Sequence, residues 1–253
     1  MNNQNVLKIL LYAAMLYQYL GAAAIDDASK QLLEASKSNN LKKVEEALGN
    51  GADVNIQDPQ NSTWDTGNTP LIYAAQNGNV AMVQFLIKAG TDVNIQNQKG
   101  NTPLYTAVVN RHFDIVDILL RNGALINIGN SVGTTPLIAA IKVGPEYKAI
   151  VQNLLNAGAN PNVADKTGIT PLMYAVLSRY LPLVVIIVES GANLFATNSR
   201  GQTALDLARP GEIRQFLNEI ILLMSAEKEY RNVLEAKFAG MKWPKLPHRI
   251  SKL

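Results

Sequence analysis

The phrase "GNTPLIYAA" at residues 67–75 decides the fold, because it returns along the chain with few changes. It reappears as "GNTPLYTAV" at 100–108, "GTTPLIAAI" at 133–141 and "GITPLMYAV" at 168–176, and a degraded copy, "GQTALDLAR", begins at Gly201. The leading glycines are 33, 33, 35 and 33 residues apart. A fixed period in this range is typical of a solenoid made of stacked supersecondary units. The sequence therefore predicts a repeat architecture.

A single copy predicts two short helices and a turn. Thr102-Pro103 is a helix start, because the hydroxyl can cap an amide of the first turn and proline needs no donor there. This helix should end near Val109, and a second apolar stripe over residues 113–120 should form a helix that Gly123 ends. The following "ALINIGNSVG" suits a β-hairpin. Helices this short are marginal alone, so each unit needs its neighbour.

A second landmark recurs in phase with the first, as "GADVN" at 51, "GTDVN" at 90, "GALIN" at 123, "GANPN" at 158 and "GANLF" at 191. With the G-x-T-P-L phrase and the V-x-x-L-L helix, this pattern resembles the ankyrin repeat family over about residues 28 to 224. The resemblance implies an all-α repeat solenoid of helix-turn-helix units with β-hairpin fingers, stacked in an L shape. We expect about six units with N- and C-terminal caps: the first is more charged, and the last has Ala204 in place of proline before a long helical run.

The chain departs from the family pattern at two repeated positions. The resemblance implies a histidine after Thr-Pro-Leu that links adjacent turns, but this chain has Ile72, Tyr105, Ile138 and Met173 there. We expect those links to be missing and the repeats to depend more on apolar packing. The glycine between the two helices is kept as Gly78 and Gly144 but becomes Arg111 and Arg179, where we expect backbone strain.

Two insertions interrupt the period. The segment "KVGPEYK" adds two residues, which should lengthen the turn between two helices. The segment "IQDPQNSTWDT" at 56–66 adds six residues at a finger tip. Its Trp64 could contact a partner or fold back over the first two repeats, and we hold both readings open. Asn61-Ser62-Thr63 is also an N-glycosylation sequon, on which we place little weight.

Composition limits the classes of function. With 253 residues, 47% hydrophobic and 17% charged, the chain should fold, and its net charge of +3 gives no reason to expect nucleic acid binding. Cysteine is absent and there are two histidines, which removes disulfides and thiolate metal sites. Because the sequence contains no H-E-x-x-H, P-loop or G-x-G-x-x-G motif, we predict no enzyme, no cofactor and no metal site. His112 lies at an inter-helix turn, where a structural role is the simpler reading.

The N-terminal segment has the features of a secretory signal. Lys8 precedes an uncharged, mostly apolar stretch from Ile9 to Ala24 that ends in small residues. Sixteen helical residues reach about 24 Å, short of the roughly 30 Å hydrocarbon core of a bilayer. We therefore predict a signal peptide at 1–24, an exported protein in the periplasm or outside the cell, and a mature chain starting near Ile25. The alternatives are an apolar helix docked on the first repeat and an uncleaved segment that tethers a structural scaffold to a membrane.

We divide the rest into a repeat domain at 25–224 and a C-terminal helix and basic tail at 225–253. From Lys237 onward the chain has five cations and no acidic residue, so the tail could weakly contact a membrane or another anionic surface, or be a solvated terminus.

By motif position, the resemblance assigns protein binding to the finger tips and to the concave groove beside the first helices, where Tyr73, Tyr105 and Tyr174 could also be contacts or core. We expect a monomer that binds another protein. The predicted tip residues are Trp64, Asp65, Thr66, Asn68, Gln98, Lys99, Asn101, Ser131, Val132, Thr134, Lys166, Thr167 and Ile169, and the predicted groove residues are Gln76, Asn77, Val109 and Asn110.

Overall fold

The computed structural model describes residues 27–58 and 67–237, with side chains as far as Ala226. The chain divides into two compact units, Met1–Leu125 and Ile126–Leu253, which meet in the loop after one of the predicted repeats. Within the described residues the helices form six pairs, three in each unit, as the sequence predicted.

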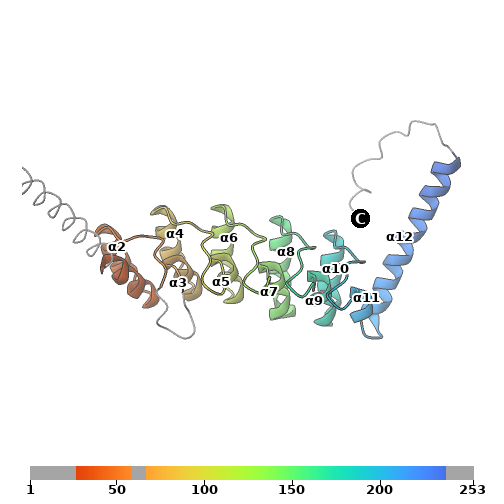
Figure 1. The fold of residues 1–253 in the computed structure, drawn as a ribbon, viewed down its shortest axis with the longest axis horizontal. Helices are drawn as coiled ribbons and strands as arrows, with labels where there is room; N and C mark the ends of the chain where they lie inside the picture. Colours follow the sequence, from red (N-terminus) through yellow and green to blue (C-terminus); the bar gives the residue numbers. More distant parts are fainter. Residues whose placement is uncertain (1–26, 59–66, 238–253) are drawn as a thin grey trace, which may run out of the picture. The chain divides into compact units, whose positions relative to one another are not determined.

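Unit 1 consists of three helix pairs packed side by side. Between the second and third pairs, the first helices α3 and α5 contact each other, and so do the second helices α4 and α6. Figure 1 shows α3 and α5 in one row and α4 and α6 in a second row. The pairs are a helix over residues 27–37 with α2 (Leu41–Gly49), α3 (Pro70–Asn77) with α4 (Val80–Lys88), and α5 (Pro103–Val109) with α6 (Phe113–Arg121).

Unit 2 repeats the arrangement with one modification at each end. The inserted residues of "KVGPEYK" form a short 3-10 helix, η1 (Pro145–Tyr147), so the predicted longer turn is confirmed. The last pair joins a four-residue helix to one of 26 residues, which also confirms the predicted long helical run. The pairs are α7 (Pro136–Val143) with α8 (Lys148–Asn156), α9 (Pro171–Leu177) with α10 (Leu181–Glu189), and α11 (Ala204–Leu207) with α12 (Glu212–Lys237).

The Thr-Pro phrase starts the helices as predicted. Thr69, Thr102, Thr135 and Thr170 are each the N-cap of a first helix, and proline takes the first helical position. Each threonine hydroxyl accepts a hydrogen bond of 3.1 to 3.3 Å from the backbone N–H three residues later. Such a cap satisfies one of the otherwise unpaired amides of the first turn, so the phrase sets where each repeat begins.

The position after Thr-Pro-Leu belongs to the core in three of the four copies. Ile72, Ile138 and Met173 are buried, with at most 1% of their surface exposed, whereas Tyr105 is half-buried. The leucine that precedes each of them, such as Leu71, is also buried. Apolar side chains thus fill the place where the family resemblance implied histidine.

Polar contacts between repeats are also present, at a position that the sequence analysis did not identify. The last asparagine of the "GADVN" landmark reaches the next repeat: Asn94 Oδ1 accepts from the Leu125 N–H at 2.8 Å, and its Nδ2 donates to the Gly123 carbonyl at 3.2 Å. Asn55, Asn127 and Asn162 make the equivalent bond to the following repeat within their own units. We call these residues the asparagine ladder.

The fingers differ from the predicted β-hairpins. No strand occurs in the described ranges, and each complete finger is instead a five-residue loop, at 97–101, 130–134, 165–169 and 198–202. In each loop the first N–H donates to the fifth carbonyl, and the glycine N–H donates to the first carbonyl, at 2.8 to 3.1 Å. The chain therefore reverses direction without enough pairing for strands.

The strained turns expected from the sequence are confirmed. Arg111 and Arg179 have φ angles of 67° and 57°, in the left-handed region that Gly78, at 73°, occupies in the equivalent turn. A side chain in this conformation costs about 1 kcal/mol relative to glycine.

Arg111→Gly should therefore raise the free energy of unfolding by roughly 1 kcal/mol, because glycine adopts the same turn without the steric cost. Chemical denaturation of the two proteins measures the difference. Stability that is unchanged or lower would show that contacts of the Arg111 side chain outweigh the strain.

The C-terminal boundary predicted at residue 225 lies inside α12, so the second helix of the last repeat and the predicted C-terminal helix are one element. The predicted signal peptide at 1–24 and the basic tail from residue 238 lie outside the described residues. Of the helices that are described, none combines the length and the apolar character needed to cross a bilayer.

Candidate protein-binding surface

One asparagine or aspartate fixes the shape of every complete finger. In the loop at 97–101, Asn97 Oδ1 accepts from the N–H groups of Lys99 at 3.0 Å and Asn101 at 2.9 Å. Asn130, Asp165 and Asn198 make the same two bonds in their own loops. We call these four residues the finger Asx residues. Sequence reasoning missed them, although each lies three residues before a leading glycine.

The side chains between these fixed points are open to solvent. Six predicted tip residues are exposed, whereas Asn101 and Ile169 are half-buried. Val132 is 58% exposed, which places an apolar side chain at the tip of one finger of unit 2. The exposed predicted tip residues are Gln98, Lys99, Ser131, Val132, Lys166 and Thr167.

Two predicted tip residues are internal and do not fit a contact role. Asn68 is 1% exposed, and its Oδ1 accepts a hydrogen bond of 2.7 Å from Asn97 Nδ2. Thr134 is 4% exposed, and its backbone N–H and carbonyl both bond Asn130. Both residues precede the capping threonine of a first helix, so they hold the finger to the helix instead of facing outward. Trp64, Asp65, Thr66 and the sequon lie outside the described residues.

The predicted groove residues lie at the ends of α3 and α5, where they are partly engaged in unit 1. Asn77 and Asn110 are exposed, but their side-chain amides donate to the carbonyls of Ser36 and Thr106. Gln76 is half-buried, and Val109 is 41% exposed. Gln76 and Val109 are each the seventh residue after a capping threonine, so they occupy equivalent positions near the ends of α3 and α5.

The repeat period identifies three further residues at this position that were not predicted. Lys37 in unit 1, and Lys142 and Leu177 in unit 2, occupy the position of Gln76 and Val109. Leu177 is 50% exposed and Lys142 is also exposed. We call these five equivalent positions the first-helix row, three of them in unit 1 and two in unit 2. The repeat period alone could have identified its three additional members.

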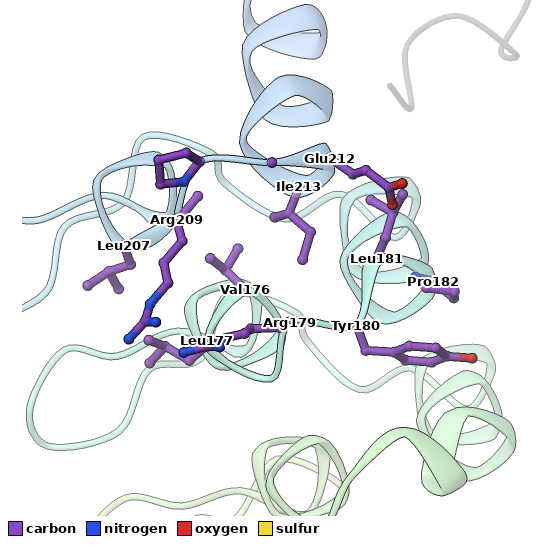
Figure 2. A pocket seen from close by; sticks show the side chains of 13 residues that line it. Val176, Leu177, Arg179, Tyr180, Leu181, Pro182, Leu207, Arg209, Glu212 and Ile213 are labelled. Atoms are coloured by element: carbon purple, nitrogen blue, oxygen red, sulfur yellow. The ribbon is translucent and has the colours of Figure 1, made fainter.

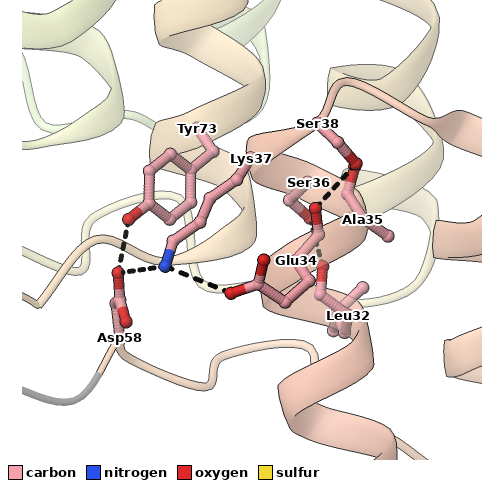
Figure 3. A network of polar contacts seen from close by, with 8 residues as sticks. All are labelled: Leu32, Glu34, Ala35, Ser36, Lys37, Ser38, Asp58 and Tyr73. Atoms are coloured by element: carbon pink, nitrogen blue, oxygen red, sulfur yellow. Dashed lines mark hydrogen bonds and ion pairs between the residues drawn. The ribbon is translucent and has the colours of Figure 1, made fainter.

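Lys37 is held by a polar network at the base of the first finger (Figure 3). Its ammonium lies 2.8 Å from Asp58 Oδ2, which also accepts a 2.6 Å hydrogen bond from the Tyr73 hydroxyl. The ammonium is 5.6 Å from the centre of the Tyr73 ring. Burial opposes the charged form, but the hydrogen bond and charge of Asp58 outweigh it and raise the pKa of Lys37. Tyr73 is buried, which favours the core reading left open above.

The same three residue types recur in unit 2. Tyr174 donates a 2.6 Å hydrogen bond to Asp165 Oδ2, and the Lys142 ammonium lies 5.2 Å from the centre of the Tyr174 ring. Burial, followed by the hydrogen bond and charge of Asp165, raises the pKa of Tyr174 to about 12. Burial opposes ionisation of Asp165, but hydrogen bonds from Thr167, Tyr174 and backbone amides prevail and lower its pKa. At both Asp58 and Asp165, a tyrosine hydroxyl therefore holds the Oδ2 atom of an aspartate at the start of a finger.

Asp165→Asn should lower the pKa of Tyr174 toward its ordinary value of 10.0, because the carboxylate that disfavours tyrosinate is removed. Ultraviolet titration of the tyrosines measures this shift, with Tyr174→Phe identifying the signal. In the parent chain, the raised pKa means that this pair stabilises the fold below about pH 10 and loses its contribution as pH rises toward 12. Because the pKa of Asp165 is lowered in the fold, the stability that its carboxylate contributes is lost only as pH falls below its unfolded-state pKa of about 3.9. A Tyr174 titration unchanged by Asp165→Asn would contradict this assignment.

The described residues were compared with the side-chain groups that hold metal ions in proteins. No cluster of three or more histidine, aspartate or glutamate side chains that could hold a metal ion occurs there. The ring of His112 instead packs on Gly78, and its Nε2 lies 3.1 Å from the Gln76 carbonyl. His112 thus links α5 and α6 to the preceding repeat, which agrees with its structural reading.

Comparison with protein families assigns the repeats. Models described as ankyrin repeats in three copies, a single ankyrin repeat and ankyrin repeats in many copies match residues 32–130, 132–166 and 152–208. No curated protein matches the chain significantly. The matched ranges follow the helix pairs and fingers described above, from the first repeat to α11, and they agree with the resemblance carried by the repeated phrases. The chain belongs to the ankyrin repeat family.

Proposed function

We propose that this chain is a non-enzymatic module that binds another protein through its finger tips and first-helix row. Ankyrin repeats mediate protein–protein interaction, and the chain belongs to that family. The observation that supports this use of the surface is the contrast between fixed loop backbones and varied exposed side chains. At the third finger position, equivalent loops carry Lys99, Val132, Thr167 and Arg200.

Exposed apolar side chains give this surface its expected binding energy. In unit 2, Val132 is 58% exposed and Leu177 is 50% exposed. Burying a side chain of this size against a partner contributes roughly 1.5 to 3 kcal/mol. Because Val132 lies on a loop closed by hydrogen bonds and Leu177 ends helix α9, binding should cost little ordering entropy.

A crosslinking experiment tests this surface. A photoreactive amino acid at Val132 should crosslink one partner in extracts of the source cells, and Val132→Asp or Leu177→Asp should lower capture of that partner at least tenfold. Ala149→Asp on the exposed face of α8 is the matched control and should leave capture unchanged. Equal loss with Ala149→Asp, or full capture by both surface variants, would exclude this surface. Trp64→Ala applies the same test to the long first finger.

We further propose that the module is exported and acts as a monomer. The support is the sequence of residues 1–24, whose charge and apolar pattern is that of a cleaved signal. Mass spectrometry of the N-terminus of the protein from its source cells tests this: a chain that starts near Ile25 agrees with export. An intact Met1 in the membrane fraction would instead favour the tethered scaffold.

A further inference from the structure

A pocket of about 440 Å³ opens in unit 2 between the turn that joins α9 to α10 and the turn that joins α11 to α12 (Figure 2). It lies at the turns between paired helices, so none of the four finger loops contributes to it. Its size is within the range of pockets that hold ligands in proteins. We call it the turn pocket.

The turn pocket exists because the last repeat is shorter than the others. Nine residues separate the cap Thr203 from Glu212, whereas eleven separate Thr170 from Leu181 in the preceding repeat. As a result α11 has only four residues, and the chain leaves it extended at Ala208, with ψ at 122°. Arg214 Nη1 donates to the Ala208 carbonyl at 2.8 Å and holds this path. The last turn of an ordinary first helix would fill the space that stays open here.

The lining of the turn pocket combines apolar walls with two cations. Its apolar part comes from Val176, Leu177, Leu181, Leu207 and Ile213, of which Leu177 is 50% exposed. Two arginines, Arg179 and Arg209, also line the pocket, against one acidic residue, Glu212. In Figure 2 both arginine side chains extend toward the side of the pocket where Leu177 lies, and Glu212 lies toward the opposite side.

Neither arginine has an internal partner to account for its presence. Within the ranges that the structure describes, the side chains of Arg179 and Arg209 make no hydrogen bond or ion pair, and both residues are exposed. Arg179 also carries the cost of its left-handed backbone, at a φ of 57°, which glycine would remove. A strained residue that the fold does not need points to a use of its guanidinium outside the chain.

We propose that the turn pocket binds an acidic peptide segment of another protein, one that places a leucine-sized side chain on the apolar wall and carboxylates on Arg179 and Arg209. Guanidinium groups pair with carboxylates in two parallel hydrogen bonds, which fixes the orientation of the peptide. The basic tail of this chain is a poor match, because from Lys237 onward it has five cations and no acid. The turn pocket shares Leu177 with the first-helix row but contains no finger residue, so variants at Arg179 and Arg209 test it separately from Val132.

The equivalent turn in unit 1 provides a natural comparison. There a pocket of about 230 Å³ is lined by Gly78, Arg111, His112 and Phe113. The ring of His112 packs against Gly78 there and narrows the space between the two turns. Arg111 shares the strained conformation of Arg179 without the large apolar wall, so a variant at Arg111 is a matched control.

Binding of a fluorescein-labelled peptide of sequence EELLEE to the full-length chain, followed by fluorescence anisotropy, tests the proposal. The parent chain should bind with a Kd in the micromolar range, and Arg179→Gly and Arg209→Glu should each weaken binding by roughly tenfold or more. Arg179→Gly should also raise the melting temperature, so its loss of binding cannot come from unfolding. Arg111→Gly should raise the melting temperature and leave peptide binding unchanged.

Two altered peptides separate the contributions of charge and apolar contact. QQLLQQ and EESSEE should each bind at least roughly tenfold more weakly than EELLEE, because one lacks carboxylates and the other lacks the leucines. No saturable binding of EELLEE up to about 1 mM, or equal binding by the parent chain and both arginine variants, would overturn the proposal. A large gain in affinity on removing residues 238–253 would also overturn it, in favour of the tail as occupant.

Discussion

Gly133→Ala should lower the free energy of unfolding by about 3 kcal/mol. Gly133 has a φ of 81°, so any side chain there pays the left-handed cost of about 1 kcal/mol. An added Cβ would also lie 2.7 Å from the backbone nitrogen of Lys166 and 3.0 Å from Asp165 Cα. These are backbone atoms of the next finger, held in place by the Lys166 N–H, which donates to the Val132 carbonyl at 3.0 Å. Because they cannot rotate away, overpacking should cost a further 1 to 3 kcal/mol.

Gly158→Ala separates these two contributions in the same unit. Gly158 has a φ of 94°, but no atom lies within 4 Å of the position its Cβ would take. This variant should therefore lose only the conformational part, about 1 kcal/mol. Urea denaturation of both variants gives the difference. If the two variants lost equal stability, the close approach of the two fingers at Gly133 would contribute nothing.

Asn97→Ala should lower the free energy of unfolding by about 2 to 4 kcal/mol. The substitution removes the acceptor for the N–H groups of Lys99 and Asn101, and it leaves the buried Asn68 Oδ1 without its donor. A typical hydrogen bond contributes about 1 kcal/mol, and a buried polar group left unpaired costs about 1 to 3 kcal/mol. The loss should therefore exceed that of an ordinary surface substitution, although it lies in a loop.

Asn97→Asp is the informative companion to this variant. Aspartate keeps the acceptor that closes the loop, as Asp165 does at the equivalent position. Asn68 can turn its amide and donate to the new carboxylate, so the cost should be about 1 kcal/mol or less. Thermal and urea denaturation should rank the parent chain above Asn97→Asp and both above Asn97→Ala. The reverse order of the two variants would show that the side-chain donor, and not the loop acceptor, stabilises the finger.

The fold could be predicted from the sequence where a local signal and a repeat agree. The Thr-Pro starts depend on a cap and a fixed φ within three residues, and the structure places these caps at Thr69, Thr102, Thr135 and Thr170. The strain at Arg111 and Arg179 followed from the same periodic comparison and is confirmed. Both features depend on residues that are close together in the sequence, so a single sequence was sufficient to predict them.

The conformation of the fingers was harder to predict, because two local structures compete for the same backbone N–H groups. Short β-prone segments around a turn favour a hairpin, but an asparagine or aspartate at the start of the loop offers its side chain to the same N–H groups that a strand partner would use. In the loop at 130–134 the Asn130 side chain takes both of them. Sequence reasoning weighed the turn and missed the acceptor.

Positions that depend on distant packing could not be read from the sequence. Asn68 looked like a tip residue by motif position, yet its burial depends on Asn97, 29 residues away. The turn pocket left a weak signal, the shortened spacing from Thr203 to Glu212, but its open volume depends on where α12 meets α10 and α11. The repeat period alone is sufficient to assign Leu177 and Lys142 to the first-helix row, so a more complete comparison of the repeats would have identified them.

Phe195 stands where the earlier repeats carry the last asparagine of the ladder, and it is 57% exposed. Its side chain has no amide that could form a hydrogen bond with the landmark loop of a following repeat. A repeat that gene duplication added after this point would therefore lack the ladder hydrogen bond to the repeat before it. A duplicated internal repeat would carry its own ladder asparagine. Of the five landmark segments, the one at 191–195 is therefore the only one whose last residue cannot make a ladder bond.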